Sequence, residues 1–277
     1  MATAPKATTT AAKKEGTGSN IFASLTIVIC IVIGVLLWKY VMGSPTNFEG
    51  GDPENGHPLP GNYFGMVYKG GLIVPILMGM LLMVFVFSIE RFIVINKAAG
   101  TGNVDIFVKK IQAFLSAGNI ESAISECDKQ KGSVANVIKS GLKKYREVET
   151  DAVMNTEQAS LAIQKDIEEA TALEMPMLEQ NLTVIATLVS VGTLTGLLGT
   201  VTGMIKAFSA LATAGAPDSA ALANGISEAL INTATGISTS TVAIIMYNIF
   251  TSKIDKLTYS IDEAGFSIVQ TYASTHK

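Results

Sequence analysis

The sequence has few charged residues, few cysteines and few histidines. Asp, Glu, Lys and Arg make up 16% of its 277 residues, and it contains two cysteines and two histidines. Two separated cysteines form no disulfide framework, and no Cys, His or carboxylate cluster has the spacing of a metal site. The net charge is −3, and no basic cluster indicates nucleic-acid binding. We therefore expect no metal, no cofactor and no nucleic-acid partner.

The chain is instead rich in long apolar runs, since 48% of its residues are hydrophobic. The runs lie at 21–42, 70–96, 182–206 and 226–250, and each has about the 20 residues that a helix needs to cross a bilayer. A cleaved signal peptide is the alternative for the first run, but that run is longer than the usual apolar core of about 7–15 residues. We therefore predict an all-α, polytopic membrane protein with four transmembrane helices embedded in the lipid bilayer.

The distribution of Lys and Arg predicts the orientation. The segment 97–181 carries ten of these residues, whereas the loop 43–69 has only Lys69 and the loop 207–225 has none. By the positive-inside rule, both termini and the 97–181 segment are cytoplasmic, and the two loops face outward. The tail 1–20 is too poor in large apolar residues to fold and is predicted to be disordered. Residues 251–277 are expected to be a cytoplasmic helix or tail.

Residues 97–181 read as a small helical domain. Asn103 and Asn119 are placed as helix caps, and Gly118 and Gly132 are placed as helix ends. Further helices are expected at about 133–148 and 151–176, the last running through Pro176 almost continuously into the third span. The loop 43–69 is rich in Gly, Pro and Asn, which predicts turns rather than a domain.

The least expected residue is Glu228, the only Asp, Glu, Lys, Arg or His between Asp218 and Lys253. A charge in hydrocarbon costs several kcal/mol unless it faces a bundle interior or water, so Glu228 is a candidate functional residue. In a helix, Asn232 lies one turn further along the same face, and Thr233 lies on the adjacent strip. A polar stripe is therefore predicted along an otherwise apolar helix.

The third span contains small residues at close-packing spacing, namely Gly192, Gly196, Gly199 and Gly203. Such residues let helix backbones approach each other in lipid. A phosphate-binding loop is excluded because there is no GK[ST] sequence and no preceding strand.

A short loop joins spans three and four into a hairpin, so Thr200 and Thr233 are predicted to face each other at similar depth. For any single threonine, the plainer alternative is a hydrogen bond to its own helix. The charged residues at the membrane edges are expected to have structural roles only. Glu90 is expected to pair with Arg91, and Lys206 is expected to reach the outer interface.

Three segments together resemble a known family. They read LLGTVTGMIKAF at 197–208, ISEALINTATGI at 226–237, and ERFIVINKA at 90–98. This combination is similar to the signature of the MotA/TolQ/ExbB proton-channel family, with the ExbB branch the nearest in appearance. The chain departs from that branch in its additional span at 21–42, and Asn232 stands where a small apolar residue is common.

The resemblance implies a function and a set of partners. It implies that Thr200 and Thr233 are pore threonines, that Glu228 is the family's glutamate, and that Asn232 can hydrogen-bond to Glu228. Members of this kind form a pentamer around an ExbD-like single-span protein, whose membrane aspartate carries the proton. The implied function is use of the proton motive force across a bacterial inner membrane to drive TonB-dependent transport through a TonB-like transducer.

Other functions stay open at this point. Within the family, a TolQ-like envelope-maintenance subunit or a MotA-like stator fits the same residues. Outside it, a non-conducting membrane scaffold would use the polar stripe only for assembly. An intramembrane enzyme is opposed by the sequence, because both histidines lie outside the spans and no cysteine lies near Glu228.

Overall fold

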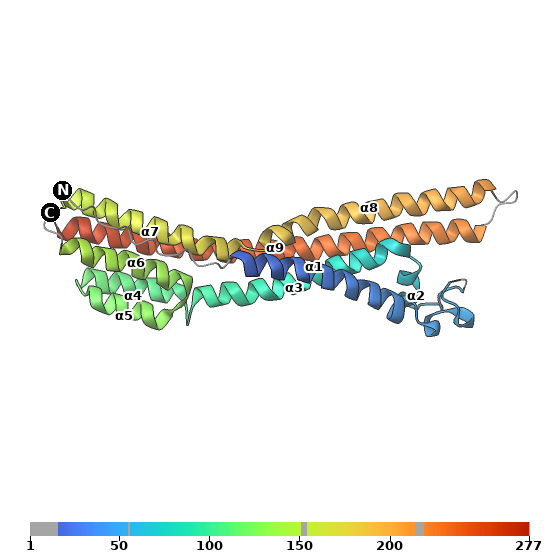
Figure 1. The fold of residues 1–277 in the computed structure, drawn as a ribbon, viewed down its shortest axis with the longest axis horizontal. Helices are drawn as coiled ribbons and strands as arrows, with labels where there is room; N and C mark the ends of the chain where they lie inside the picture. Colours follow the sequence, from blue (N-terminus) through green and yellow to red (C-terminus); the bar gives the residue numbers. More distant parts are fainter. Residues whose placement is uncertain (1–15, 55, 151–153, 214–218, 277) are drawn as a thin grey trace, which may run out of the picture.

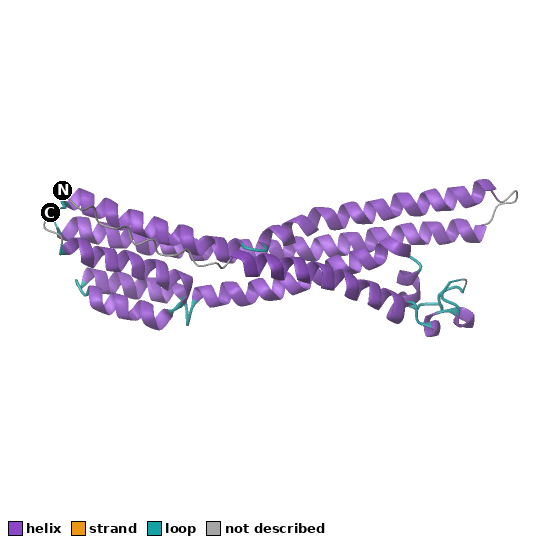
Figure 2. Cartoon of the chain, in the orientation of Figure 1, coloured by secondary structure: helices purple, strands orange, loops and turns teal. Residues whose placement is uncertain are grey.

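The computed structural model describes residues 16–54, 56–150, 154–213 and 219–276. Within these residues the regular elements are helices and no strand forms, apart from one isolated bridge between Phe48 and Pro58 (Figure 2). Most of the tail predicted to be disordered, namely residues 1–15, lies outside the described residues.

The helices run along an elongated molecule, with a helical domain at one end and the 43–69 loop toward the other (Figure 1). These are called the domain end and the loop end below. The α-helices are α1 (Gly16–Leu36), α2 (Tyr63–Tyr68), α3 (Val74–Ala99), α4 (Val104–Ser116), α5 (Ile120–Gln130), α6 (Gly132–Glu149), α7 (Thr156–Glu179), α8 (Leu182–Thr213) and α9 (Ser219–Thr275). Short π or 3-10 helices lie at Leu37–Met42, Pro45–Asn47, Glu49–Gly51 and Gly71–Ile73.

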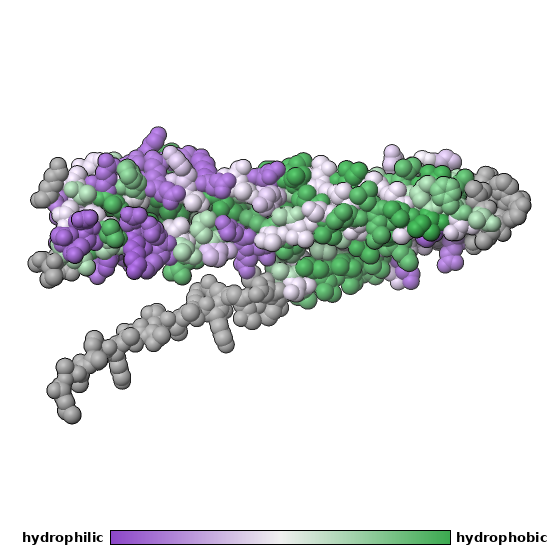
Figure 3. Space-filling model, turned by 90° about the horizontal axis from the view of Figure 1, so that it is seen from above, coloured by the Kyte–Doolittle hydropathy of each residue, from purple (hydrophilic) through white to green (hydrophobic). Residues whose placement is uncertain are grey.

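Four helical segments are long and apolar enough to cross a membrane. They lie in Phe22–Met42, Gly71–Ser116, Thr156–Ser209 and Leu222–Thr275. Apolar side chains gather on the half of the molecule toward the loop end, whereas polar side chains cover the domain (Figure 3). The predicted all-α, polytopic fold is thereby confirmed.

The last helix is longer than the predicted span. α9 continues for 57 residues without interruption, about 85 Å at the usual rise per residue, from the loop end into the helical domain. The predicted transmembrane helix 226–250 and the predicted tail 251–277 are therefore parts of one rigid element. A movement of α9 in the membrane would be transmitted directly to the domain.

The junction of α7 and α8 is the one point where the expected continuity breaks. Pro176 lies inside α7, and the break comes at Gln180 and Asn181. Asn181 has a φ of 62°, in the left-handed region that Asn tolerates better than most residues. The chain thus changes direction there and begins α8 at Leu182.

In the domain, α4, α6 and α7 pack against the C-terminal half of α9, and α5 packs against α4 and α6 (Figure 1). Asn103 caps α4 and Asn119 caps α5, as predicted, with side-chain oxygens 2.8 and 3.0 Å from the amides of Asp105 and Ser122. Gly132 was expected to close α5, but α5 ends at Gln130 with Lys131 as its C-cap, and Gly132 begins α6. The remaining helices agree with the expected positions to within a few residues at each end.

The loop 43–69 is built from turns and the short helix α2, as its composition predicted. Trp38 stacks on Tyr68 with ring centroids 4.6 Å apart and donates a hydrogen bond to the Tyr68 carbonyl. Asn47 is buried and binds the carbonyls of Val41 and Met42, each at 2.9 Å. These contacts fasten the loop to the end of the first span.

The additional helix α1 packs on α3 through two glycines. A Cβ on Gly34 would lie 2.8 Å from the backbone nitrogen of Gly79, and a Cβ on Gly79 would lie 2.9 Å from the Cα of Ile31. The backbones therefore touch at this crossing. Most of the remaining surface of α1 is exposed, as expected for a helix whose other faces meet lipid.

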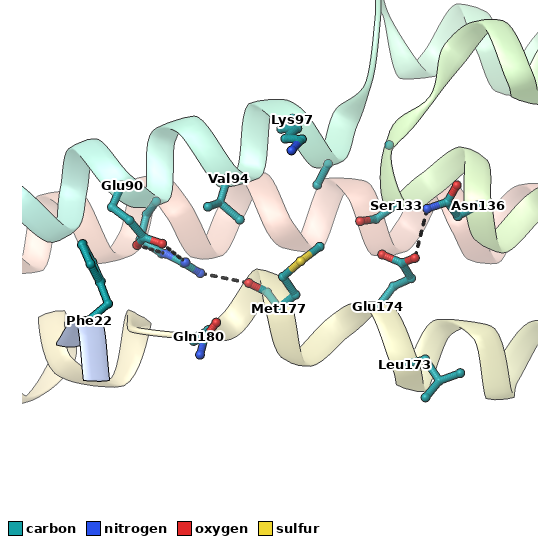
Figure 4. A pocket seen from close by; sticks show the side chains of 13 residues that line it. Phe22, Glu90, Val94, Lys97, Ser133, Asn136, Leu173, Glu174, Met177 and Gln180 are labelled. Carbon is teal, nitrogen blue, oxygen red and sulfur yellow. Dashed lines mark hydrogen bonds and ion pairs between the residues drawn. The ribbon is translucent and has the colours of Figure 1, made fainter. Parts of the chain in front are cut away.

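Arg91 has a larger structural role than mutual pairing with Glu90. Only 1% of its surface is exposed, and its guanidinium donates to the carbonyls of Met177 (3.0 Å) and Leu178 (3.2 Å) at the end of α7. The same group binds the Glu90 carboxylate through Nε at 2.6 Å (Figure 4). Arg91 therefore ties α3 to the α7/α8 junction, where the last carbonyls of a helix need donors.

Replacing Arg91 should lower the free energy of unfolding more than replacing an exposed arginine. We expect Arg91→Ala to lower the free energy of unfolding by about 3–5 kcal/mol, because it removes the cationic partner of Glu90 and the donor to two carbonyls. Arg146→Ala is the control, since its pair with Glu121 is exposed and is worth roughly 0.2–1 kcal/mol. Thermal unfolding in detergent, followed by circular dichroism, measures both; similar midpoints for the two variants would contradict the assigned role.

Candidate functional site

The candidate site lies between α8 and α9, which run side by side as the predicted hairpin (Figure 1). All four predicted packing glycines of α8 lie against α9. A Cβ on Gly196 would be 3.0 Å from the Asn232 carbonyl oxygen, and one on Gly203 would be 3.0 Å from the Ala229 nitrogen. A Cβ on Gly236 of α9 would be 2.7 Å from the Gly192 carbonyl oxygen. Neither backbone has room for a side chain here.

This close approach brings Thr200 and Thr233 together. Their hydroxyl oxygens are in hydrogen-bonding contact across the two helices. Each hydroxyl also lies 3.3 Å from the carbonyl four residues earlier in its own helix, Gly196 for Thr200 and Ala229 for Thr233. Each threonine is therefore within reach both of a carbonyl of its own helix and of the threonine on the facing helix.

A hydroxyl has one proton to donate, which gives this pair two arrangements. Either Thr200 donates to Thr233, which then donates to the Ala229 carbonyl, or Thr233 donates to Thr200, which then donates to the Gly196 carbonyl. The heavy atoms need not move between the two. The pair can thus change the direction of its hydrogen bonds without becoming charged.

A second hydroxyl pair joins the same helices two turns toward the domain end. Thr193 lies 2.8 Å from Ser240, which is buried beside Gly192. Neither residue was among the predicted pore residues. The signal was present in the sequence, because Thr193 precedes Thr200 by seven residues and Ser240 follows Thr233 by seven, which places them on the same helix faces.

Asn232 is fully buried and has a partner that the sequence did not indicate. Its Nδ2 donates to the carbonyl of Gly70 at 2.9 Å, just before α3. The expected bond to Glu228 is not among the contacts of the described residues. A partner 162 positions away in the sequence is set by tertiary packing and not by helical spacing.

Glu228 is paired with Lys206. The Lys206 Nζ lies 2.8 Å from Oε1 of Glu228, with the carboxylate side chain 16% exposed and the lysine side chain 62% exposed. The carboxylate also lies against Gly71, where an added Cβ would collide with it. Lys206 was expected only to reach the outer interface, but it is also the counter-ion of Glu228.

A hollow of about 610 Å³ runs along α8 beside Thr200. Its walls include Val201, Ile205 and Phe208, whose surfaces are 55–60% exposed in the single chain. Thr200 therefore faces α9 on one side and an open apolar surface on the other. Within the described residues no group of three His, Cys, Asp or Glu side chains could hold a metal ion.

Comparison with known proteins supports the family that the motifs resemble. The model of the MotA/TolQ/ExbB proton channel family matches residues 129–263, from the end of α5 through most of α9. Through this segment, just under half of its length, the chain is similar to the MotA/TolQ/ExbB proton channel family. Helix α1, the loop 43–69 and helix α3 lie before the matched segment.

Curated relatives agree with that match. A putative biopolymer transport protein ExbB-like 3 of Synechocystis sp. is 35% identical over 88 residues, which are 31% of this chain and 42% of the relative. The Tol-Pal system protein TolQ of Pseudomonas aeruginosa is 31% identical over 124 residues, 45% of this chain and 54% of the relative. A putative ExbB homolog of Methanothermobacter thermautotrophicus is 26% identical over 199 residues, 70% of this chain and 66% of the relative. The chain thus spans about half the length of the first two relatives.

The close packing of α8 and α9 can be tested at Gly236. We expect Gly236→Ala to destabilise the protein by about 1–3 kcal/mol, because the new methyl group meets the Gly192 backbone, which cannot move alone. Gly265→Ala on the same helix is the control, since its Cβ would meet only the Ile167 side chain at 3.3 Å. Equal thermal midpoints in detergent for the two variants would show that the helices are not held at backbone contact.

Proposed function

We propose that this chain is the channel subunit of an inner-membrane complex that converts the proton motive force into work. In this proposal the chain forms a homo-oligomer around an ExbD-like single-span partner, and the family resemblance implies that this oligomer is a pentamer. The complex serves a TonB-like transducer. Helices α4 to α7 and both termini lie in the cytoplasm, and the loop end faces outward. The observation that carries the proposal is the Thr200–Thr233 contact between two helices of a chain that is similar to a proton channel family.

The threonine pair is suited to passing protons along, not to holding a charge. Two neutral hydroxyls that can reverse their hydrogen bonds provide donors and acceptors without the cost of a charge in hydrocarbon. The titrating group would then be the partner's membrane aspartate, lying in the hollow along α8 beside Thr200. A unit charge crossing 100 mV releases about 2.3 kcal/mol, which is enough to bias a conformational equilibrium.

Glu228 has a separate role in this proposal. It lies one turn from Asn232 toward the loop end and is paired with Lys206, so it marks the outward entrance rather than the middle of the path. The pair presents both a donor and an acceptor at the entrance while keeping the local net charge near zero. Desolvation of a lone carboxylate is thereby avoided.

A TolQ-like role in envelope maintenance is the second candidate. It is favoured by the similarity to the TolQ protein of P. aeruginosa over residues of the same family segment. The two candidates share the ion path and differ in the transducer. Co-purification of the native complex separates them by the single-span partner and transducer that it retains.

Removing either hydroxyl of the pair should stop proton flow without preventing assembly. We expect Thr200→Val and Thr233→Val, reconstituted with the partner in liposomes, to abolish acidification measured with a pH-sensitive dye. Thr200→Ser should retain flux, since it keeps the hydroxyl. Thr241→Val is the matched control on α9, because that exposed hydroxyl bonds only to its own helix at Ile237, 2.8 Å away. Normal flux in both valine variants would refute the path.

The entrance pair distinguishes a channel from a scaffold. We expect Glu228→Gln to lower proton flux by roughly tenfold, a barrier increase of about 1.4 kcal/mol, while the oligomer still forms. Lys206→Gln is the control, because it breaks the same ion pair but leaves the carboxylate in place. A non-conducting scaffold predicts that Glu228→Gln leaves transport unchanged.

A further inference from the structure

Two cavities lie at the level where the apolar spans give way to the helical domain. One, of about 440 Å³, lies between the end of α3, the start of α4 and α9. The other, of about 740 Å³, lies between α1, α3, α6 and α7 and is seen in Figure 4. Lys253 lines the first and is the first charged residue after the apolar part of α9. Lys97 lines the second and lies in the last turn of α3. Both cavities are thus at the depth of lipid headgroups.

The two cavities differ in charge. The larger one has Lys97 and Arg91 but also Glu90 and Glu174, so its charges cancel, and Arg91 is already bound to Glu90. The smaller one is lined by Lys253 and Lys256, and no carboxylate lines it. Asp105 lies near it and pairs with Lys256 at 2.9 Å. One positive charge in the smaller cavity is therefore left without a carboxylate partner.

That unbalanced charge is carried by Lys253. The side chain is half-buried, and its ammonium lies over the ring of Phe92 at 4.7 Å from the centroid. Among the described residues it makes no ion pair. The cavity also contains the amide of Asn96, a further hydrogen-bond donor. Lys253, Asn96 and Lys256, which pairs with Asp105, thus supply donors around one cavity, and an anion such as a phosphate accepts hydrogen bonds from donors of this kind.

Apolar surface continues from this cavity toward the loop end. On α3, Phe92 and Ile89 precede Asn96 by four and seven residues, and on α9, Ile249 precedes Lys253 by four residues. These three apolar side chains are 45–62% exposed. By helical spacing they lie on the same faces as the polar groups of the cavity. A ligand with a phosphate at one end and hydrocarbon chains at the other matches this arrangement.

We propose that the cavity lined by Asn96, Lys253 and Lys256 binds an anionic phospholipid from the leaflet at the domain end. The phosphate lies between the two ammonium groups, and the acyl chains follow the apolar surface of Phe92 and Ile249. Because the headgroup would bridge α3 and α9, it fastens the last helix of the hairpin to its neighbour at the membrane surface. Lipid binding here is independent of the ion path and does not rest on the proposed function.

The test counts lipids on the purified full-length chain. The protein in detergent is mixed with equal amounts of phosphatidylglycerol and phosphatidylethanolamine of identical acyl chains, and the bound lipids are counted by native mass spectrometry. We expect a preference for phosphatidylglycerol, which falls roughly tenfold in Lys253→Gln/Lys256→Gln. The Lys253→Arg/Lys256→Arg variant should keep it, since it keeps the charge.

Lys97→Gln is the matched control, because Lys97 lies at the same depth in the charge-balanced cavity. An equal loss in Lys97→Gln, or no loss in the double glutamine variant, would overturn the site. Displacement of the lipid by millimolar inorganic phosphate would overturn the phospholipid as occupant. Fewer chains per particle in the double variant, with unchanged lipid per chain, would instead assign the cavity to an interface between copies. Circular dichroism checks that each variant keeps its helices.

Discussion

Backbone contact between α8 and α9 is the constraint on which the site depends. Hydroxyl side chains are short, so Thr200 can reach Thr233 only if the helix axes are closer than large side chains allow. Gly196 and Gly236 provide that closeness, since a methyl group on either would meet the opposing backbone. The same approach permits the Thr193–Ser240 pair. The hydroxyl contacts therefore depend on the close packing of the two helices. A glycine substitution is expected to disturb both the packing and these contacts.

The rest of the chain is attached to this hairpin by a few buried polar contacts. Asn232 binds the Gly70 carbonyl and so fixes the start of α3 against α9. At the other end of α3, Arg91 binds the last carbonyls of α7, where the chain turns into α8. The Arg91 contact satisfies carbonyls at a helix end, and in an apolar setting such groups are expensive to leave unpaired. Helix α3 thus holds the hairpin at both ends.

Local signals predicted the spans, the caps and the Thr200–Thr233 contact. Hydropathy, Asn103 and Asn119 as caps, and glycine spacing are all read within a few residues, and a short loop forces two helices to face each other. The partners of Glu228 and Asn232 could not be predicted from the sequence, because they lie far away along the chain. Lys206 is separated from Glu228 by the hairpin loop, and Gly70 is 162 positions from Asn232. Arg91 looked like a surface pair because burial at a helix junction leaves no local pattern in the sequence.

The Lys206–Glu228 pair bears on how charge can move through the membrane part. The Lys206 ammonium lies 2.8 Å from the Glu228 carboxylate, so opposite charges stand together at the loop end of the hairpin. The groups next along the hairpin are hydroxyls and an amide, which do not titrate near neutral pH. In the proposed function, the titrating group in the middle of the membrane is therefore assigned to the partner and not to these residues of the hairpin. The open apolar surface beside Thr200 is where a partner helix bearing such a group would contact the hydroxyl pair.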